Sequence, residues 1–193
     1  MPVGVFGGTF DPPHAGHLAL VDAAVERFRL DRLVVVVTGL PPHKETRTDP
    51  ETRLRLAEAA FAGRDNVEVS RHELDRPGPS YTVETARWAA RTWGEAIFFV
   101  GADEFADFPA WKDPDEILDH VRLGVATRPG YARERLDTVA AELRRPERVE
   151  FFEIPPVPVS SSEVRRRVSA GEPIEGLVPA PVARLIAERD LYR

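Results

Sequence analysis

The stretch GGTFDPPHAGH, which runs from Gly7 to His17, decides how this chain should fold because of what stands on either side of it. A short apolar run at residues 3–6 comes before it, and apolar residues recur at helical spacing after it, over residues 17–30. A strand, a glycine-rich turn and a helix in this order form the first unit of a doubly wound sheet, which binds its ligands at such turns. We therefore expect a ligand-binding turn near residue 10.

The rest of the chain continues to alternate short apolar runs with longer amphipathic segments. The apolar runs are rich in Val, Ile and Phe and predict further strands at residues 33–37, 67–69, 96–100, 123–126 and 149–154. The amphipathic segments predict helices at residues 50–62, 82–92, 132–144, 161–170 and 180–189, and another that begins at Asp113 with a capping box to Glu116. Parallel strands need such crossover helices, so we expect an α/β fold, a Rossmann-like parallel sheet with helices on both faces.

Length and composition limit the classes of protein to which the chain can belong. Its 193 residues, of which 42% are hydrophobic and 30% charged, fit a single globular domain over residues 1–193. The net charge of −6 argues against a nucleic-acid-binding surface, and no sustained apolar run predicts a membrane span. Because the chain has no cysteine and starts with a predicted strand rather than a secretion signal, we expect a cytoplasmic protein. The sequence leaves open whether it is a homo-oligomer.

The turn between the first strand and the first helix carries residues suited to phosphate. Gly7 and Gly8 let the backbone approach a ligand closely, and the start of the following helix offers N–H groups and a positive dipole. His14 and His17 lie near that helix start, where both imidazoles could donate hydrogen bonds to phosphate oxygens that gain charge during a reaction. The sequence therefore predicts a nucleotide-phosphate site here.

Two other interpretations of the histidine pair stay open at this point. One histidine could merely cap the helix or fill a gap in the core. Alternatively, the pair could form a metal site with Asp11 or Asp103, since imidazole and carboxylate are common zinc ligands. The chain has no HExxH pattern and no cysteine, and a metal site would leave the two glycines unexplained. We therefore expect no metal site formed by protein side chains.

Later segments carry weaker signals of the same kind. Serines at residues 160–162 open a helix with Arg165 one turn inside it, which could bind an anion, although an ordinary serine-capped helix would look the same. Gly101 follows a predicted strand, and Asp103 after it could accept hydrogen bonds from a ribose. Trp111 could stack on a ligand ring or could be a packing aromatic.

The segment from Gly7 to His17 resembles the [S/T]-F-D-P-x-H-x-G-H signature of the nucleotidyltransferase superfamily that contains the bacterial nicotinate-nucleotide adenylyltransferases. Further segments are similar to motifs of that family: PPHK at residues 41–44, PSYTVET at 79–85, GADEFADFPAW at 101–111 and VSSSEVR at 159–165. The segment from residue 177 to residue 192 also looks like the end of these proteins. The resemblance therefore covers nearly the whole chain.

The resemblance implies a role for each matching residue. His14 and His17 would be catalytic, because the family's histidines bind ATP phosphates and stabilise the transition state. Arg165 would be catalytic as well, because it matches the arginine that should bind the triphosphate. The residues implied to bind ATP are Gly7, Gly8, Thr9, Phe10, His14, His17, Lys44, Gly101, Asp103, Ser161, Ser162 and Arg165. Those implied to bind the acceptor are Lys44, Thr82, Thr85 and Trp111, with Trp111 stacked on the pyridine ring.

The reaction implied by the resemblance transfers AMP from ATP to nicotinate mononucleotide, giving nicotinate adenine dinucleotide and pyrophosphate in NAD biosynthesis. A magnesium ion would arrive with the triphosphate. Two alternatives stay open: a related adenylyl- or cytidylyltransferase with another phosphorylated acceptor, and a non-catalytic nucleotide-binding sensor. Residues 37–40 and the phenylalanines Phe105 and Phe108 depart from the family pattern and could reshape the acceptor pocket.

Overall fold

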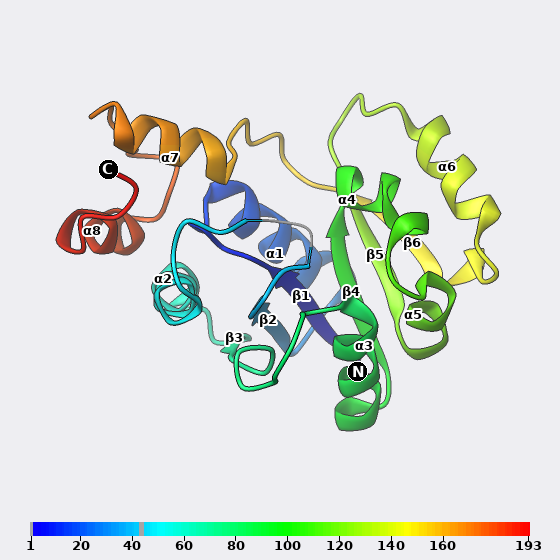
Figure 1. Cartoon of the computed structure of the whole chain (residues 1–193). Coiled ribbons are helices and arrows are strands. Elements are labelled where there is room, and N and C mark those ends of the chain that lie inside the picture. Colours follow the sequence, from blue (N-terminus) through cyan, green and yellow to red (C-terminus); the bar gives the residue numbers. More distant parts are fainter. Residues whose placement is uncertain (1, 43–44) are drawn as a thin grey trace.

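The computed structural model describes residues 2–42 and 45–193 and shows an α/β fold built on one six-stranded sheet (Figure 1). The strands are β1 (Val3–Gly8), β2 (Leu33–Val37), β3 (Val67–Ser70), β4 (Ala96–Gly101), β5 (Arg122–Thr127) and β6 (Val149–Glu153). The α-helices are α1 (Ala15–Phe28), α2 (Pro50–Phe61), α3 (Thr82–Trp93), α4 (Ala102–Ala106), α5 (Pro114–His120), α6 (Arg133–Glu142), α7 (Ser161–Ser169) and α8 (Ala180–Glu188). Short 3-10 helices are η1 (Phe108–Ala110) and η2 (Pro146–Arg148).

All neighbouring strands of the sheet pair in parallel, in the order β3-β2-β1-β4-β5-β6. From β1 the chain winds outward through β2 and β3, then returns to β4 on the other side of β1 and continues outward to β6. The winding direction therefore reverses between β1 and β4. In such sheets the connections diverge at this switch point and leave a crevice at the carboxyl ends of the strands.

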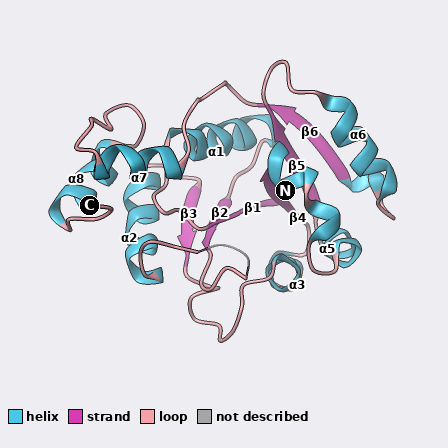
Figure 2. Cartoon of the chain, turned by 45° about the horizontal axis from the view of Figure 1, so that its top comes forward, coloured by secondary structure: helices cyan, strands magenta, loops and turns pink. Residues whose placement is uncertain are grey.

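Helices cover both faces of the sheet, as Figure 2 shows. Successive residues of a strand point to opposite faces, so neighbouring valines of β2 enter different cores. Val35 is fully buried in a cluster with apolar residues of α1, α2, α7 and α8. Val34 is fully buried in a second cluster with apolar residues of α3, α4, α5 and α6. The predicted sheet with helices on both faces is confirmed.

The predicted strands all exist, and their observed ends lie within two residues of the predicted ones. The largest difference is at β1, which includes Gly7 and Gly8 instead of ending before them. Both residues pair with β2, opposite Val36 and Val37. The sequence did not predict α4, η1 or η2, because helices of 5 and 3 residues are too short to show helical periodicity.

The predicted capping box at the start of α5 is wrong. Asp113 precedes α5 with a backbone φ of 51°, and within the described part of the chain its side chain makes no capping hydrogen bond. Glu116 instead accepts a hydrogen bond from Nε of Arg87 on α3 at 2.6 Å. The Glu116 carboxylate therefore pairs with a guanidinium of a neighbouring helix. A capping rule considers only residues that are close in the sequence, so it could not predict this pair.

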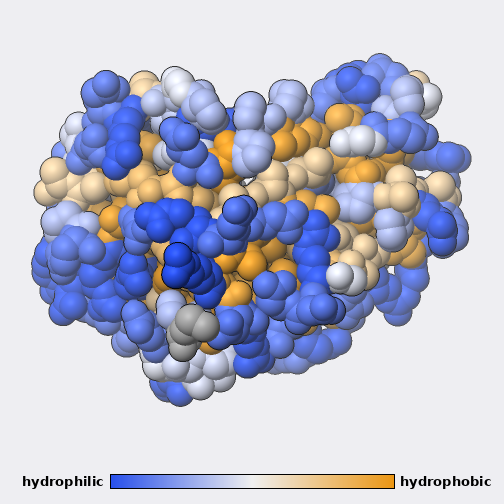
Figure 3. All heavy atoms as spheres, turned by 180° about the vertical axis from the view of Figure 1, so that it is seen from behind, coloured by the Kyte–Doolittle hydropathy of each residue, from blue (hydrophilic) through white to orange (hydrophobic). Residues whose placement is uncertain are grey.

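The surface of the molecule is mixed in character. Figure 3 shows one face on which hydrophilic residues cover most of the area and hydrophobic ones show between them. No helix in the described ranges combines the length and the apolar character that a membrane span requires.

Candidate functional site

A cavity of about 550 Å³ lies at the carboxyl ends of β1 and β4, at the switch point of the sheet. Its walls come from segments that are far apart in the sequence. They include the end of β1, the start of α1, the loops that follow β2 and β6, the start of α3, and the residues around α4. This is where doubly wound sheets bind their ligands.

His14 and His17 stand together on the cavity wall at the start of α1. Their rings are stacked, with centroids 3.7 Å apart and an angle of 26° between the planes. The backbone N–H of His14, which is the N-cap residue, donates to Nδ1 of His17 at 3.1 Å. Because Nδ1 accepts this bond, a neutral His17 carries its proton on Nε2, where it can donate to a ligand. The helix-capping and phosphate-binding interpretations are therefore compatible.

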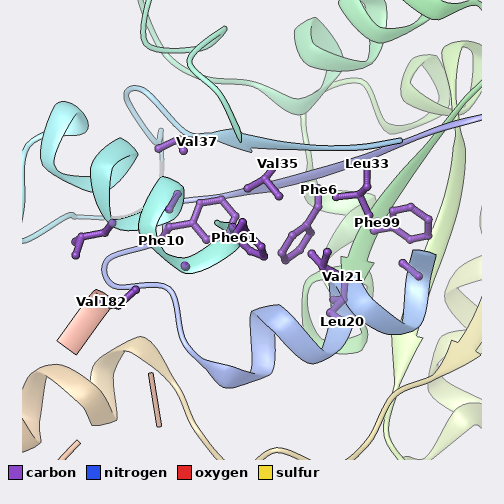
Figure 4. Packing of buried hydrophobic residues seen from close by; sticks show 14 of the residues in the cluster. Phe6, Phe10, Leu20, Val21, Leu33, Val35, Val37, Phe61, Phe99 and Val182 are labelled. Atoms are coloured by element: carbon purple, nitrogen blue, oxygen red, sulfur yellow. The ribbon is translucent and has the colours of Figure 1, made fainter. Parts of the chain in front are cut away.

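The ring of Phe10 lies in the core rather than on the cavity wall, unlike Gly7, Gly8 and Thr9, which line the cavity. Phe10 is fully buried and packs edge-on against Phe61, with ring centroids 6.1 Å apart (Figure 4). Its ring also lies edge-on to that of His17, with centroids 5.1 Å apart. A Cβ on Gly8 would lie only 2.8 Å from Cζ of Phe10. The ring of Phe10 therefore packs against His17 and does not face the cavity, so an ATP contact of Phe10 stays a prediction that only its backbone could meet.

The start of α7 closes another side of the cavity. Ser160 lines the cavity as the N-cap of α7, and its Oγ accepts from the backbone N–H of Glu163 at 3.1 Å. Ser161 donates through its Oγ to the backbone oxygen of Pro12 at 2.9 Å. The hydroxyl of Ser161 thus joins α7 to the loop between β1 and α1. The serines at residues 160–162 were predicted together as a possible anion site, and Ser160 is the one of them that lines the cavity.

Arg165 holds the same two segments together. Its Nη1 donates to the backbone oxygen of Asp11 at 2.7 Å and its Nη2 to Oγ of Ser162 at 3.1 Å. Among the described residues, the cavity wall does not include Ser161, Ser162 or Arg165. Their expected contacts with ATP therefore stay predictions, and a triphosphate would have to reach past Ser160 to meet them.

Asp11, which follows Phe10, accepts hydrogen bonds from two distant parts of the chain. Its carboxylate is 3% exposed and accepts from the backbone N–H of Arg47 at 2.6 Å. The hydroxyls of Thr48 and Tyr192 each donate to its Oδ1 at 2.8 Å. Burial beside this carboxylate raises the pKa of the Tyr192 hydroxyl above its ordinary value, so Tyr192 remains a donor. Asp11 is therefore the residue that fixes the loop carrying the histidines.

The predicted acceptor residues Thr82 and Trp111 both line the cavity, on the side opposite α7. Trp111 is half-buried and its ring lies against that of Phe108, with centroids 5.4 Å apart. Lys112 also lines the cavity and lies over the ring of Tyr81, 4.4 Å from its centroid. Lys44, predicted to serve both substrates, lies outside the described residues.

Gly101 and Asp103 reach the cavity from the end of β4, as expected. Oδ1 of Asp103 accepts a hydrogen bond from the hydroxyl of Tyr131 at 3.1 Å, and Tyr131 lines the cavity as well. Arg128 follows β5 and is another cavity residue that the sequence analysis missed. Its place directly after a parallel strand is a signal that could have found it.

Thr85 does not reach the cavity, which corrects its expected side-chain contact with the acceptor. Thr85 is fully buried, and its hydroxyl donates to Oε1 of Glu73 in a short hydrogen bond. Glu73 is 7% exposed and also interacts with the hydroxyl of Ser80. The hydroxyl of Thr85 is thus used inside the fold, where it holds the segment that leads into α3.

Burial raises the pKa of the Glu73 carboxyl above its usual value near 4.5, and hydrogen bonds from Thr85 and Ser80 only partly oppose this. Glu73 therefore keeps its proton to higher pH in the folded chain than in the unfolded chain. Since the folded state binds more protons in this window, the free energy of unfolding falls as pH rises from about 4.5 through the raised pKa. Glu73→Gln should remove this decline.

Urea unfolding of wild type and Glu73→Gln at a series of pH values from about 4.5 to 8 measures the effect. The exposed Glu58 on α2 offers a matched control, because Glu58→Gln should leave the pH dependence unchanged. Parallel curves for wild type and Glu73→Gln would contradict the prediction.

The described residues contain no group of three or more His, Cys, Asp or Glu side chains placed to hold a metal ion. In particular, Asp11 is occupied by its own three hydrogen-bond donors. Asp103 in turn accepts from Tyr131.

Known proteins resemble this chain over its whole length. Residues 5–167 match the cytidylyltransferase-like family. A protein of Rubrobacter xylanophilus named "Probable nicotinate-nucleotide adenylyltransferase" is 41% identical over 198 residues, covering 100% of this chain and 92% of that protein. A protein of the same name from Thermus thermophilus is 40% identical over 195 residues, covering 100% of both. The solved structure of Plasmodium falciparum nicotinic acid mononucleotide adenylyltransferase complexed with NaAD shares the fold, with a TM-score of 0.81 at 15% identity, covering 99% of this chain and 97% of that one.

Proposed function

This chain belongs to the nicotinate-nucleotide adenylyltransferases of the cytidylyltransferase-like family, and we propose that it transfers AMP from ATP to nicotinate mononucleotide in NAD biosynthesis. The products are nicotinate adenine dinucleotide and pyrophosphate. One observation carries the proposal: the same cavity at the switch point is lined by the stacked histidines and by Thr82 and Trp111. Such a cavity can hold two nucleotides with their phosphates side by side.

The nucleotide end of the cavity is built for an ATP phosphate chain. We propose that Nε2 of His17, fixed by the bond at Nδ1, donates to the α-phosphate oxygens, with His14 beside it. The backbone at Gly7, Gly8 and Thr9 leaves room for the phosphates, and Gly101 and Asp103 lie where a ribose would accept and donate hydrogen bonds. Magnesium belongs to the substrate here, bound to the triphosphate that it partly neutralises.

In the proposed reaction, an oxygen of the acceptor's phosphate attacks the α-phosphorus of ATP, and the bond from that phosphorus to the bridging oxygen breaks. Pyrophosphate leaves with the electron pair, and no bond to the protein forms. The protein contributes position and charge stabilisation, as is general in phosphoryl transfer. Lys112 and Arg128 on the wall add positive charge to a site that must hold two anionic substrates.

At the acceptor end, we propose that the Trp111 ring stacks on the pyridine ring and that Thr82 lies beside its carboxylate. Replacing Trp111 by Ala should raise the Michaelis constant for the acceptor by about tenfold, since base–aromatic stacking contributes on the order of 1–3 kcal/mol. The constant for ATP should change little. Steady-state kinetics with each substrate varied in turn measures both.

Trp93 provides the matched control for this change. It is a partly buried tryptophan at the end of α3 that packs on Trp88, with centroids 4.7 Å apart. Trp93→Ala should leave the acceptor constant unchanged. An acceptor constant in Trp111→Ala equal to that of wild type would show that this ring does not stack on the acceptor.

The function itself is tested by pyrophosphate release from ATP and magnesium in four parallel reactions: nicotinate mononucleotide, nicotinamide mononucleotide, phosphopantetheine and no acceptor. Turnover that is fastest with nicotinate mononucleotide supports the proposal. Preference for another acceptor would overturn the assignment of Trp111 and Thr82 while leaving the ATP end intact. Binding of ATP without turnover on any acceptor would indicate a nucleotide sensor instead.

A further inference from the structure

Arg53 on α2 is a buried cation that none of the sequence motifs singled out. Its side chain is fully buried, and it donates to three backbone carbonyls. Nη1 donates to the oxygens of Thr9 and Thr38, and Nη2 donates to the oxygen of Gly39 at 2.8 Å. These carbonyls lie just beyond the carboxyl ends of β1 and β2, the strands whose loops form the nucleotide end and the middle of the cavity.

Ser80 holds the opposite side of the same loop. Its Oγ accepts from the backbone N–H of Gly39 at 3.1 Å and of Leu40 at 3.2 Å, and its own N–H donates to the oxygen of Leu40 at 2.8 Å. The peptide units between residues 38 and 39 and between 39 and 40 are therefore fixed at both ends. Arg53 binds each carbonyl, and Ser80 binds each N–H.

The loop also fits tightly where Gly39 passes the segment before α3. A Cβ on Gly39 would lie 2.5 Å from the backbone oxygen of Glu73, so no side chain fits there. Glu73 in turn interacts with Ser80 and accepts from Thr85. The buried positive charge of Arg53 is balanced at longer range by Asp11 and Asp49. Arg53 and Ser80 thus form a clamp around residues 38–40, and this clamp is part of one connected polar network.

The orientation of these peptide units matters for an anionic ligand. Thr38 and Thr9 line the cavity, whereas within the described part of the chain Arg53 does not belong to its wall. The carbonyl oxygens of residues 9, 38 and 39 are thus directed at a buried side chain outside the cavity wall. If these peptide units turned over, they would present partial negative charges to two phosphate-bearing substrates, and binding would weaken.

We propose that Arg53 and Ser80 are positioning residues that hold residues 38–40 with their carbonyls turned away from the cavity, so that both anionic substrates can bind. The inference rests on the proposed function for its kinetic part only. The clamp itself concerns the protein without substrate. Arg53 binds the carbonyl of Thr9 beside the nucleotide end of the cavity and the carbonyls of residues 38 and 39. Ser80 binds only the N–H groups of residues 39 and 40.

The test compares Arg53→Lys and Ser80→Ala with wild type. Lysine keeps the positive charge but lacks the planar fork that reaches three carbonyls. We expect amide hydrogen exchange at Gly39 and Leu40, measured by NMR without substrate, to become at least about tenfold faster in both variants. The Michaelis constants for both substrates should rise in both variants, that for the acceptor by about tenfold, and that for ATP should rise more in Arg53→Lys, which also releases Thr9.

Arg55, which is exposed on the same helix, supplies the control Arg55→Lys, expected to match wild type in both measurements. A role limited to stability would reduce the amount of active enzyme and leave both Michaelis constants unchanged. Unchanged constants together with unchanged exchange at Gly39 and Leu40 would overturn the proposal. If Arg53→Lys does not fold, Ser80→Ala decides alone. Absence of turnover in wild type would instead overturn the proposed function, while the exchange rates would still test the clamp.

Discussion

Replacing His17 by Ala is expected to lower kcat by roughly two orders of magnitude or more, which is typical for the loss of one preorganised donor to a transition state. The bond from the His14 N–H to Nδ1 fixes both the tautomer and the orientation of the His17 ring. The rings of Phe10 and His14 hold it from two sides. The donor at Nε2 is therefore in place before the substrate arrives, and alanine removes it completely.

The measurement is kcat with saturating ATP and nicotinate mononucleotide, combined with a thermal unfolding curve to show that the variant folds. His120 on α5 offers a matched control, because it is a partly exposed histidine that pairs with Glu116 at 3.4 Å and lies away from the cavity. His120→Ala should retain wild-type turnover. Wild-type turnover in His17→Ala itself would remove this residue from the catalytic mechanism.

The fold could be predicted from the sequence because strand and helix periodicity is local and strong. Three of the strands, β2, β4 and β5, are buried along nearly their whole length, and their apolar runs show this directly. The parallel arrangement then follows from the helices between the strands. The elements missed between β4 and α5 are short, although they carry cavity residues such as Asp103 and Ala110.

The site could be predicted where a residue of a motif lines the cavity directly. His14, His17, Thr82 and Trp111 belong to motifs, and the structure brings all four to the cavity. A motif does not tell which way a side chain points, so it could not separate these from the buried Phe10.

Arg53 and Asp11 illustrate a second limit. Arg53 sits in an amphipathic helix where an arginine predicts a solvated face, yet its three carbonyl partners make it a buried residue. One partner of Asp11 is Tyr192, which is 181 positions away in the sequence. Contacts at that separation are set by the completed fold, and local patterns in a single sequence carry no signal of them.

Replacing Asp11 by Ala is expected to lower the free energy of unfolding by about 3–5 kcal/mol. The substitution removes the buried acceptor of three hydrogen bonds, which come from the N–H of Arg47 and the hydroxyls of Thr48 and Tyr192. Hydrogen bonds to a charged group contribute roughly 1.5–3 kcal/mol each, and part of that loss is recovered if water enters. For a chain of this size, the melting temperature should fall by roughly 10 °C.

Two further variants separate the hydrogen-bond network from the mere loss of volume. Asp11→Asn keeps one oxygen for the Arg47 N–H, and its amide can donate to the Thr48 and Tyr192 hydroxyls, so it should lose less stability than Asp11→Ala. Tyr192→Phe removes a single donor and should cost about 1–2 kcal/mol. The exposed Asp31 provides the control Asp31→Ala, expected to match wild type. If Asp11→Ala and Asp31→Ala unfold at the same urea concentration, the carboxylate does not hold the histidine loop, because the loss of three hydrogen bonds to a buried carboxylate must lower stability.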